Sequence, residues 1–194
     1  MKVVPTSTLP EVLVIEPTVY SDPRGFFVES YHAPRYREAG IDVTFVQDNQ
    51  SRSVRGTLRG LHWQVAPHPQ AKLVRVVDGE ILDVAVDVRE GSPTFGRWAA
   101  VTLSSENFRQ LFVPVGFAHG FLVLSERADI EYKCSDVYDP ASERGLMWND
   151  PALGIAWPQR TALLSPRDAA LPPLAALELA LSRPAANVGS ASSR

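Results

Sequence analysis

The chain has 194 residues, of which 45% are hydrophobic and 21% are charged, and its net charge is −3. This composition suits one globular domain with a full core, and the absence of a basic run argues against nucleic-acid binding. The single cysteine, Cys134, excludes an internal disulfide framework and a cysteine-based zinc site.

The first residues do not have the pattern of a targeting segment. Residues 1–5 are charged and then interrupted by Pro5, so they lack the apolar core of a secretory signal peptide. No apolar run approaches the length that a membrane-spanning helix needs. We therefore expect a cytoplasmic protein that does not bind a membrane.

Short β-rich runs separated by turn residues follow one another along the chain. Many of them alternate apolar and polar side chains with the period of two that is typical of a strand. The predicted strands are Val12–Ile15, Gly25–Ser30, Thr44–Ser51, Thr57–Gln64, Lys72–Val77, Glu80–Val88, Trp98–Leu103, Gln110–Val113, Ala118–Leu124, Ile130–Cys134 and Leu146–Trp148. So many short strands, without an alternation of strands and helices, predict a sandwich or a barrel.

The clearest hairpin has the pair Asp78-Gly79 between two β-branched runs, because a tight turn of this kind needs positive φ angles. In its second arm, Asp83 and Asp87 share one face, and the opposite face is apolar. Helical patterns are confined to Pro34–Ala39 and Leu174–Leu181. We expect one mainly β domain over residues 1–182, followed by a loose tail over 183–194, which is rich in Ser, Ala and Asn and has no periodicity.

Several polar side chains fall on the apolar faces of the predicted strands. His119 shares a face with Phe121, and Tyr132 shares one with Ile130. The same alternation places Lys72 among valines and aligns two amides with each other, those of Gln47 and Asn49. Polar groups inside a barrel are costly unless they are hydrogen-bonded, and a polar ligand can satisfy them.

Each of these residues also has a purely structural explanation. His119 can be a hydrogen-bonded core histidine, and Tyr132 can be a core tyrosine whose hydroxyl reaches the surface. Lys72 can extend its ammonium group to solvent, and the two amides can form a solvated edge. Together, however, these explanations require several unrelated polar residues in one small core. We therefore favour a ligand site inside the barrel.

The histidines do not form the usual metal set of a cupin. Pro114–His119 matches the second half of the cupin signature, but the first half reads Gly60–Gln64, with Gln64 in place of a second histidine. Glutamine is a poor ligand for Zn or Fe, and His62 with His119 supplies only two strong donors. Two further histidines lie beside prolines in predicted loops, and we expect both to be exposed: His32 and His68. The sequence predicts a site without a metal.

Ordered blocks of sequence connect these features. The blocks are Asp22–Glu29, Phe45–Asn49, Leu58–Gln64, Gln70–Arg75, Asp83–Val88, Ser92–Gly96, Pro114–Phe121 and Trp148–Asp150. From about Val12 to Ala170, the chain thus resembles the dTDP-4-dehydrorhamnose 3,5-epimerase family, which consists of metal-independent cupin enzymes of L-rhamnose biosynthesis. The resemblance implies an antiparallel jelly-roll barrel with few short helices, a homodimer, and catalysis without a cofactor.

Carried over position by position, the resemblance also implies roles for individual residues. His62 would be the base, Tyr132 the acid on the opposite face of the sugar, Asp168 the carboxylate that orients His62, and Lys72 a neighbour of the ketone. The implied substrate contacts are Arg24, Glu29, Gln47, Asn49, Arg59, His119, Tyr138, Glu143 and Arg167. Among them, the arginines would contact the diphosphate or the nucleotide, and Tyr138 would stack on thymine.

Three positions need a structural explanation before these roles can hold. Arg167 stands where lysine is usual in the family, so the charge is kept but its geometry differs. Strict alternation puts Arg59 and His62 on opposite faces, unless Gly60 permits a bulge. Asp168 has a second interpretation, because Ser165-Pro-Arg-Asp168 also matches a helix-capping turn.

The implied reaction is epimerisation of dTDP-4-dehydro-6-deoxy-D-glucose at C3 and C5 to dTDP-4-dehydro-L-rhamnose. Both carbons are α to the C4 ketone, and a histidine base and a lysine beside the enolate oxygen suit proton removal there. The chain has no glycine-rich dinucleotide fingerprint. Three alternatives stay open: an epimerase of C3 or C5 alone, a non-catalytic cupin that binds a sugar nucleotide, and a metal-dependent cupin oxygenase or isomerase, which Gln64 argues against.

Overall fold

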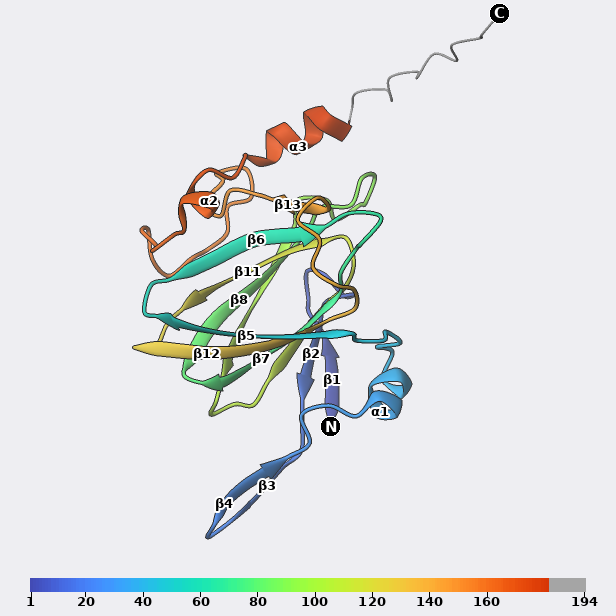
Figure 1. Ribbon diagram of the computed structural model, residues 1–194, viewed down its shortest axis with the longest axis vertical. Helices are drawn as coiled ribbons and strands as arrows, with labels where there is room; N and C mark the ends of the chain where they lie inside the picture. Colours follow the sequence, from blue (N-terminus) through green and yellow to red (C-terminus); the bar gives the residue numbers. More distant parts are fainter. Residues whose placement is uncertain (182–194) are drawn as a thin grey trace, which may run out of the picture.

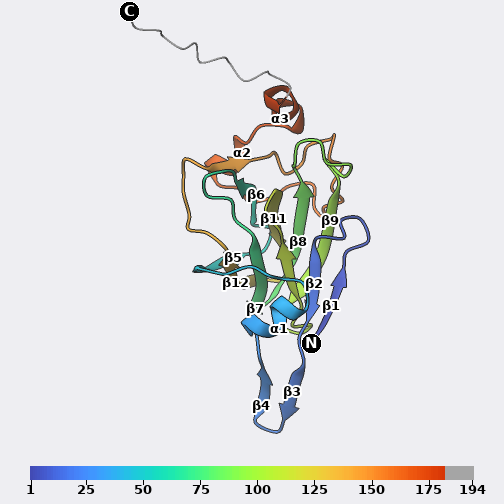
Figure 2. The ribbon, with the colours of Figure 1, turned by 90° about the vertical axis from the view of Figure 1, so that its right-hand side faces the viewer.

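The computed structural model describes residues 1–181, which form two antiparallel β-sheets packed face to face (Figures 1 and 2). The prediction of a mainly β architecture with few short helices is confirmed. The proposed loose tail, 183–194, lies outside the described residues, and the domain boundary at 182 stays a prediction.

The two sheets contain six and five strands. In spatial order, the six-stranded sheet consists of β1 (Lys2–Pro5), β2 (Leu13–Glu16), β10 (Gln110–Val113), β7 (Lys72–Asp78), β12 (Arg127–Cys134) and β5 (Gln47–Val54). The five-stranded sheet consists of β13 (Glu143–Gly145), β6 (Leu58–Gln64), β11 (Phe117–Val123), β8 (Glu80–Asp87) and β9 (Trp98–Ser104). A separate hairpin is formed by β3 (Val19–Asp22) and β4 (Gly25–Val28).

Three short helices lie outside the sheets: α1 (Ala33–Glu38), α2 (Pro166–Ala169) and α3 (Leu174–Leu181). His32 caps α1 by accepting a hydrogen bond from the backbone N–H of Arg35, and Tyr36 of the same helix packs against the outer face of the six-stranded sheet. α2 and α3 lie at the opposite end of the molecule from the β3–β4 hairpin (Figure 1). Within residues 1–181, no helix is long and apolar enough to cross a membrane.

The main core fills the space between the sheets and follows the alternation expected from the sequence. Val74 of β7, Ile81 of β8, Phe121 of β11 and Ile130 of β12 are all buried in one cluster. Burying a side chain of this size stabilises the fold by about 1.5–3 kcal/mol. Tyr132 packs against the same cluster, so the predicted inward face of β12 is confirmed.

Strand β8 is buried on both faces, which its sequence pattern alone does not distinguish. Val84 and Val86 pack on the outside of the five-stranded sheet, beneath a layer that includes Leu174 of α3. The opposite face, which carries Asp83 and Asp87, points into the barrel, and neither carboxylate is exposed to solvent. Both aspartates are therefore interior residues that require internal partners.

A bulge in β6 brings two polar side chains to the same side of the strand. The pairing with β11 joins His119 to His62 but Phe121 to Arg59, so three steps along β6 match two along β11. Gly60 lies in the extra step with φ = 124°, and a Cβ built there would be 2.6 Å from Cα of Gly120. Arg59 and His62 consequently line the same cavity. Strict strand alternation would place them on opposite faces, so the bulge is what brings both side chains inward.

We expect Gly60→Ala to destabilise the protein by at least about 1–3 kcal/mol, because the methyl group adds a backbone clash to a strained φ angle. Urea unfolding measures the loss. Gly40→Ala is the matched control, since Gly40 also has a positive φ, 92°, but nothing lies within 4 Å of the position that a Cβ would occupy there. An equal loss in the two variants would contradict the role assigned to the close approach.

Several predicted strand bounds were wrong; β12, for example, begins at Arg127 and not at Ile130. The last strand is Glu143–Gly145 and not Leu146–Trp148, because Trp148 leaves the sheet edge and packs on the outer face of the five-stranded sheet, against Leu58 of β6 and Leu122 of β11. β5 begins at Gln47 and not at Thr44, since the residues before it cover the outer face of the six-stranded sheet, where Phe45 packs against Tyr31. The sequence reasoning also missed strands β1 and β3.

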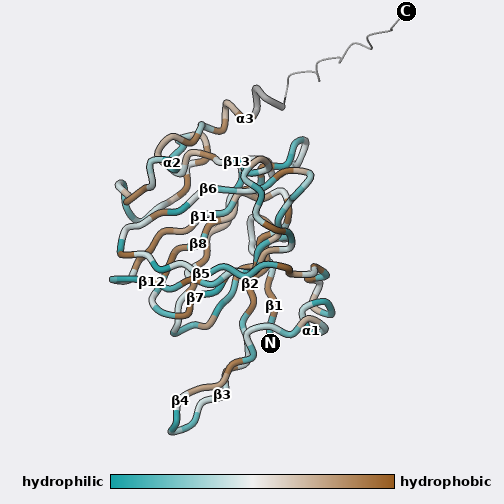
Figure 3. The backbone as a smooth tube through the Cα atoms, in the orientation of Figure 1, coloured by the Kyte–Doolittle hydropathy of each residue, from teal (hydrophilic) through white to brown (hydrophobic). Residues whose placement is uncertain are grey.

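The β3–β4 hairpin projects away from the barrel (Figures 1 and 2). Three large apolar or aromatic side chains on it are more than 60% exposed: Tyr20, Phe26 and Phe27. Hydrophobic residues accordingly stand out along this hairpin in Figure 3. An exposed apolar patch of this kind favours contact with another protein surface.

Candidate active site

The candidate site lies between the two sheets, at the end of the barrel near α2. Two hollows of about 330 Å³ and 280 Å³ share three lining residues: His62, Lys72 and Tyr132. His62 comes from the five-stranded sheet, whereas Lys72 and Tyr132 come from the six-stranded sheet. A molecule bound in the cavity therefore has the histidine on one side and the tyrosine and lysine on the other.

His62 is held by a carboxylate from α2. Its Nε2 lies 2.7 Å from Oδ1 of Asp168, and the Asp168 side chain is 6% exposed. Because a carboxylate only accepts hydrogen bonds, Nε2 carries the proton in the neutral ring and Nδ1 presents a lone pair. The short helix is fixed by Ser165, whose Oγ accepts a hydrogen bond from the backbone N–H of Asp168 at 3.0 Å. The capping interpretation is confirmed, and the same turn directs the Asp168 carboxylate to His62. The catalytic role of Asp168 stays a prediction.

A second histidine and carboxylate pair lies deeper in the barrel. Nε2 of His119 is 2.6 Å from Oδ1 of Asp83, and both side chains are buried. The other oxygen, Oδ2 of Asp83, is buried without a hydrogen-bond partner within the described chain. The sequence reasoning missed Asp83 as a site residue, because it grouped Asp83 with Asp87 on the polar face of the strand, whereas that face points into the barrel.

Burial shifts the acid–base properties of the groups around the cavity. Loss of solvent lowers the pKa of His62 below 6.5; Asp168 and Glu143 oppose this shift, and the charge of Lys72 adds to it. Burial also lowers the pKa of Lys72 from 10.5 and raises that of Tyr132 above 10. At neutral pH, His62 is therefore a neutral base, and Tyr132 keeps its proton.

A chain of hydrogen bonds forms one side of the cavity mouth. Oη of Tyr138 donates to Glu143 Oε2 at 2.6 Å, and Arg167 forms an ion pair with the same carboxylate oxygen. The backbone N–H of Tyr138 donates to Oε1 of Gln47, whose amide in turn donates to Oδ1 of Asn49 at 3.1 Å. Five predicted substrate contacts thus lie in one network around the opening.

Arg59 and His119 also line the cavity, whereas two predicted contacts do not. Arg24 lies at the tip of the β3–β4 hairpin, where its side chain is 90% exposed and pairs with Asp22. Glu29 forms an ion pair with Arg35 of α1 at 2.6 Å. Neither Arg24 nor Glu29 lines the hollows of its own chain.

The prediction that His32 and His68 are exposed was wrong, because both are half-buried. His32 caps α1, and Nδ1 of His68 lies 3.2 Å from Asp136. Gln64, which replaces a possible metal ligand, donates two hydrogen bonds to backbone carbonyls and accepts one from the backbone of Asp139. Among residues 1–181, no group of three or more His, Cys, Asp or Glu side chains is placed to hold a metal ion. The metal-free site stays a prediction.

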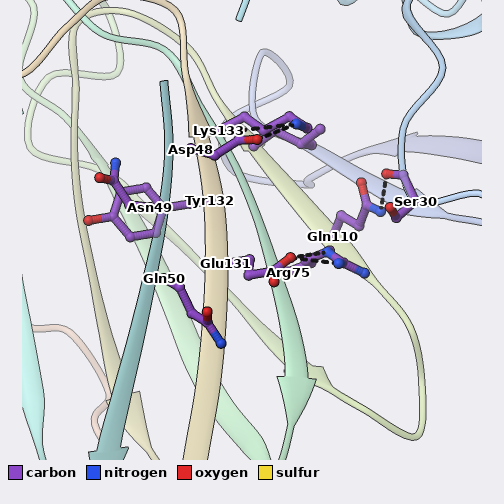
Figure 4. Close-up of a pocket in the computed structure, with 10 residues that line it drawn as sticks. Ser30, Asp48, Asn49, Gln50, Arg75, Gln110, Glu131, Tyr132 and Lys133 are labelled. Atoms are coloured by element: carbon purple, nitrogen blue, oxygen red, sulfur yellow. Dashed lines mark hydrogen bonds and ion pairs between the residues drawn. The ribbon is translucent and has the colours of Figure 1, made fainter. Parts of the chain in front are cut away.

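The outer face of the six-stranded sheet carries a separate hollow of about 400 Å³ (Figure 4). Tyr132 and Asn49 point to one side of the sheet, and the charged residues of the hollow point to the other. These charges are already paired, Arg75 with Glu131 and Lys133 with Asp48, and Cys134 on the inner side is a buried thiol. The outer hollow therefore offers no unpaired group comparable to Lys72 or Nδ1 of His62.

Comparison with known proteins identifies the family of this chain. The model of the dTDP-4-dehydrorhamnose 3,5-epimerase family matches residues 6–176. The chain belongs to this family. A relative of that name from Shigella flexneri is 53% identical over 169 residues, which cover 87% of this chain and 93% of the relative. Another, from Neisseria gonorrhoeae, is 56% identical over 165 residues, and the match covers 84% of this chain but only 50% of that longer protein.

Solved structures of related enzymes have the same fold as this chain. The epimerase of Legionella pneumophila, crystallised with dTDP-4-keto-L-rhamnose, has a TM-score of 0.88 and 52% sequence identity, covering 93% of this chain and 96% of that one. The cupin-type barrel predicted from the sequence is thereby confirmed. More distant relatives include a dTDP-4-dehydrorhamnose 3-epimerase of Streptomyces niveus, 45% identical over 155 residues, or 79% of this chain and 75% of that one.

Proposed function

We propose that this protein inverts C3 and C5 of dTDP-4-dehydro-6-deoxy-D-glucose and so forms dTDP-4-dehydro-L-rhamnose. The observation that carries the proposal is the position of His62 and Tyr132 on facing walls of one cavity, with Lys72 beside them. Inversion needs a base on one face of the sugar and an acid on the other, and these two side chains supply that arrangement. Membership of the family supports the same substrate class.

The steps follow from the protonation of each group. Nδ1 of His62 takes the proton from a carbon next to the ketone, and the C–H electron pair becomes part of an enolate. The Lys72 ammonium group stabilises the enolate oxygen. Tyr132 then protonates the carbon from the opposite wall, and solvent exchange returns His62 and Tyr132 to their starting states. Because C3 and C5 flank the same ketone, one set of residues serves both carbons.

The location of solvent deuterium tests this proposal. In D₂O, we expect deuterium at both C3 and C5 and accumulation of the 4-dehydro-L-rhamnose product, which NMR identifies. Exchange at neither carbon would exclude epimerisation and would favour a non-catalytic sugar-nucleotide-binding protein.

A single-position epimerase is the second candidate, and the 45% identity to a 3-epimerase is the observation in its favour. The same groups can act at one carbon only if the cavity prevents the sugar from presenting the other. Deuterium at C3 alone, or at C5 alone, would select this candidate.

We expect a bell-shaped pH dependence of kcat/KM. Activity requires unprotonated His62, so it falls as the pH drops through the His62 pKa, which lies below 6.5. It also requires protonated Lys72, so it falls again as the pH rises through a pKa below 10.5. An acid limb centred above pH 6.5 in initial-rate measurements would contradict the assignment of His62 as the buried base.

We also propose a cytoplasmic homodimer. Two features support a dimer: the exposed aromatic side chains of the β3–β4 hairpin, and the position of Arg24 and Glu29 outside their own cavity. A second chain would bury the hairpin and bring these charges to a neighbouring site. Light scattering is expected to give twice the mass of one chain for the wild type and a lower mass for Phe26→Ser/Phe27→Ser. A monomeric wild type would overturn the dimer without affecting the proposed reaction.

A further inference from the structure

His62 lies between two carboxylates, of which only Asp168 is hydrogen-bonded to it. Oε1 of Glu143 is 3.9 Å from His62 Nδ1, the atom on the opposite side of the ring from Asp168. The Glu143 side chain is only 8% exposed, so solvent screens its charge weakly. β13, which carries Glu143, pairs directly with β6, which carries His62. The position of the second carboxylate is therefore fixed by the sheet.

Glu143 has two side-chain partners, Tyr138 and Arg167, and both bind the carboxylate oxygen that does not face His62. Tyr138 and Arg167 contact Oε2, while Oε1 is the atom nearest to His62. Burial alone would raise the pKa of Glu143, but the hydrogen bonds from Tyr138 and Arg167, together with the charges of His62 and Arg167, lower it below 4.5, so the carboxylate is charged. The two partners themselves are about half exposed at the cavity mouth, where an incoming ligand meets them first.

Other charged or titratable groups face His62 from each neighbouring element. They are Asp168 of α2, Glu143 of β13, Lys72 of β7, Tyr132 of β12, His119 of β11 and Arg59 of β6 itself. Only Glu143 in this set is neutralised by side chains that also belong to the predicted nucleotide contacts. A ligand that engages Tyr138 and Arg167 would therefore change the electrostatic effect of Glu143 on His62.

We propose that Glu143 is a second carboxylate partner of His62, restrained by Arg167 and Tyr138 until the nucleotide part of the substrate engages those two side chains. The proposal rests on the proposed function, because it assigns Arg167 to the diphosphate and Tyr138 to the base. Binding then redirects the charge of Glu143 from its mouth partners toward Nδ1. Glu143 acts through His62 and is a positioning residue, and its effect is to strengthen the base when substrate is present.

An NMR pH titration of His62 in ¹³C/¹⁵N-histidine-labelled protein tests this inference. The probe is dTDP, which fills the nucleotide part of the site without turnover, and loss of the signal in His62→Asn assigns the resonance. In the wild type, saturating dTDP is expected to raise the pKa of His62 by about one unit more than in Glu143→Gln. The comparison removes the direct effect of the negative charge of dTDP, which both proteins experience.

Glu131→Gln is the matched control, since it removes a carboxylate from an arginine pair on the outer face, Arg75 Nη2 to Glu131 Oε2 at 2.6 Å. Its dTDP-dependent shift should equal that of the wild type. An equal shift in Glu143→Gln as well would overturn the inference. The proposed reaction would still stand in that case if deuterium enters C3 and C5.

A second comparison needs no ligand. Arg167→Gln should raise the pKa of His62 in the free protein, and most of the rise should disappear in the double variant Arg167→Gln/Glu143→Gln. A rise that is the same with and without Glu143 would show a direct effect of the arginine charge and would overturn the inference. Failure of the wild type to bind dTDP would overturn both this inference and the proposed function.

Discussion

His62→Asn is expected to lower turnover about 10²- to 10⁴-fold, the usual contribution of a positioned general base. Asparagine keeps a polar group beside Asp168 but cannot take a proton from carbon. Initial rates with the 4-keto sugar nucleotide measure the loss. The dissociation constant for dTDP should change by only a few fold, because the predicted nucleotide contacts, such as Tyr138, lie at the cavity mouth and not at the His62 ring.

A matched control separates this effect from the loss of any histidine. His32→Asn should leave turnover unchanged, because His32 caps α1 outside the cavity, and asparagine is also a favourable capping residue. If His62→Asn retained most of the wild-type rate while binding dTDP normally, His62 would not be the base.

Lys72→Met is expected to lower kcat about 10²- to 10³-fold, because methionine keeps the apolar chain but removes the charge that stabilises the enolate oxygen. The charge has an additional effect on its neighbour. The Lys72 ammonium lowers the pKa of His62, so the acid limb of the pH profile should shift upward in the variant.

Lys72→Arg provides the companion measurement. It keeps a positive charge whose pKa is much higher, so the basic limb of kcat/KM should move upward from its wild-type position. If the basic limb of kcat/KM stayed at its wild-type pH in Lys72→Arg, the pKa of Lys72 would not be the one that governs this limb. A wild-type rate in Lys72→Met would exclude the lysine from enolate stabilisation.

Much of the fold and of the cavity was predictable from local rules. Period-two alternation correctly placed Tyr132 and His119 on inward faces, because both sheets cover a shared core. Arg59 and His62 can share a face only if Gly60 permits a bulge, and the structure contains that bulge. The capping pattern around Asp168 was visible in the sequence, but its orientation toward His62 depends on where α2 lies against β6.

Other parts of the site depend on tertiary placement that no local pattern specifies. Asp83 follows the strand alternation, but β8 is buried on both faces, so its sequence did not show which face lines the barrel. The distance between Glu143 and His62 depends on how β13 pairs with β6. The sequence reasoning placed this strand three residues too late in the chain, so the pairing could not be predicted. The location of Arg24 depends on how far the β3–β4 hairpin projects, and β3 was not predicted.

The most direct test of the central claim is deuterium exchange by Tyr132→Phe in D₂O. If His62 removes the proton from one wall and Tyr132 delivers the new one from the other, the variant still forms the enolate but lacks the acid for inversion. We predict deuterium at C3 and C5 with the original configuration retained and little inverted product, whereas His62→Asn shows neither exchange nor inversion. Inversion by Tyr132→Phe at the wild-type rate would contradict the assignment of acid and base to facing walls.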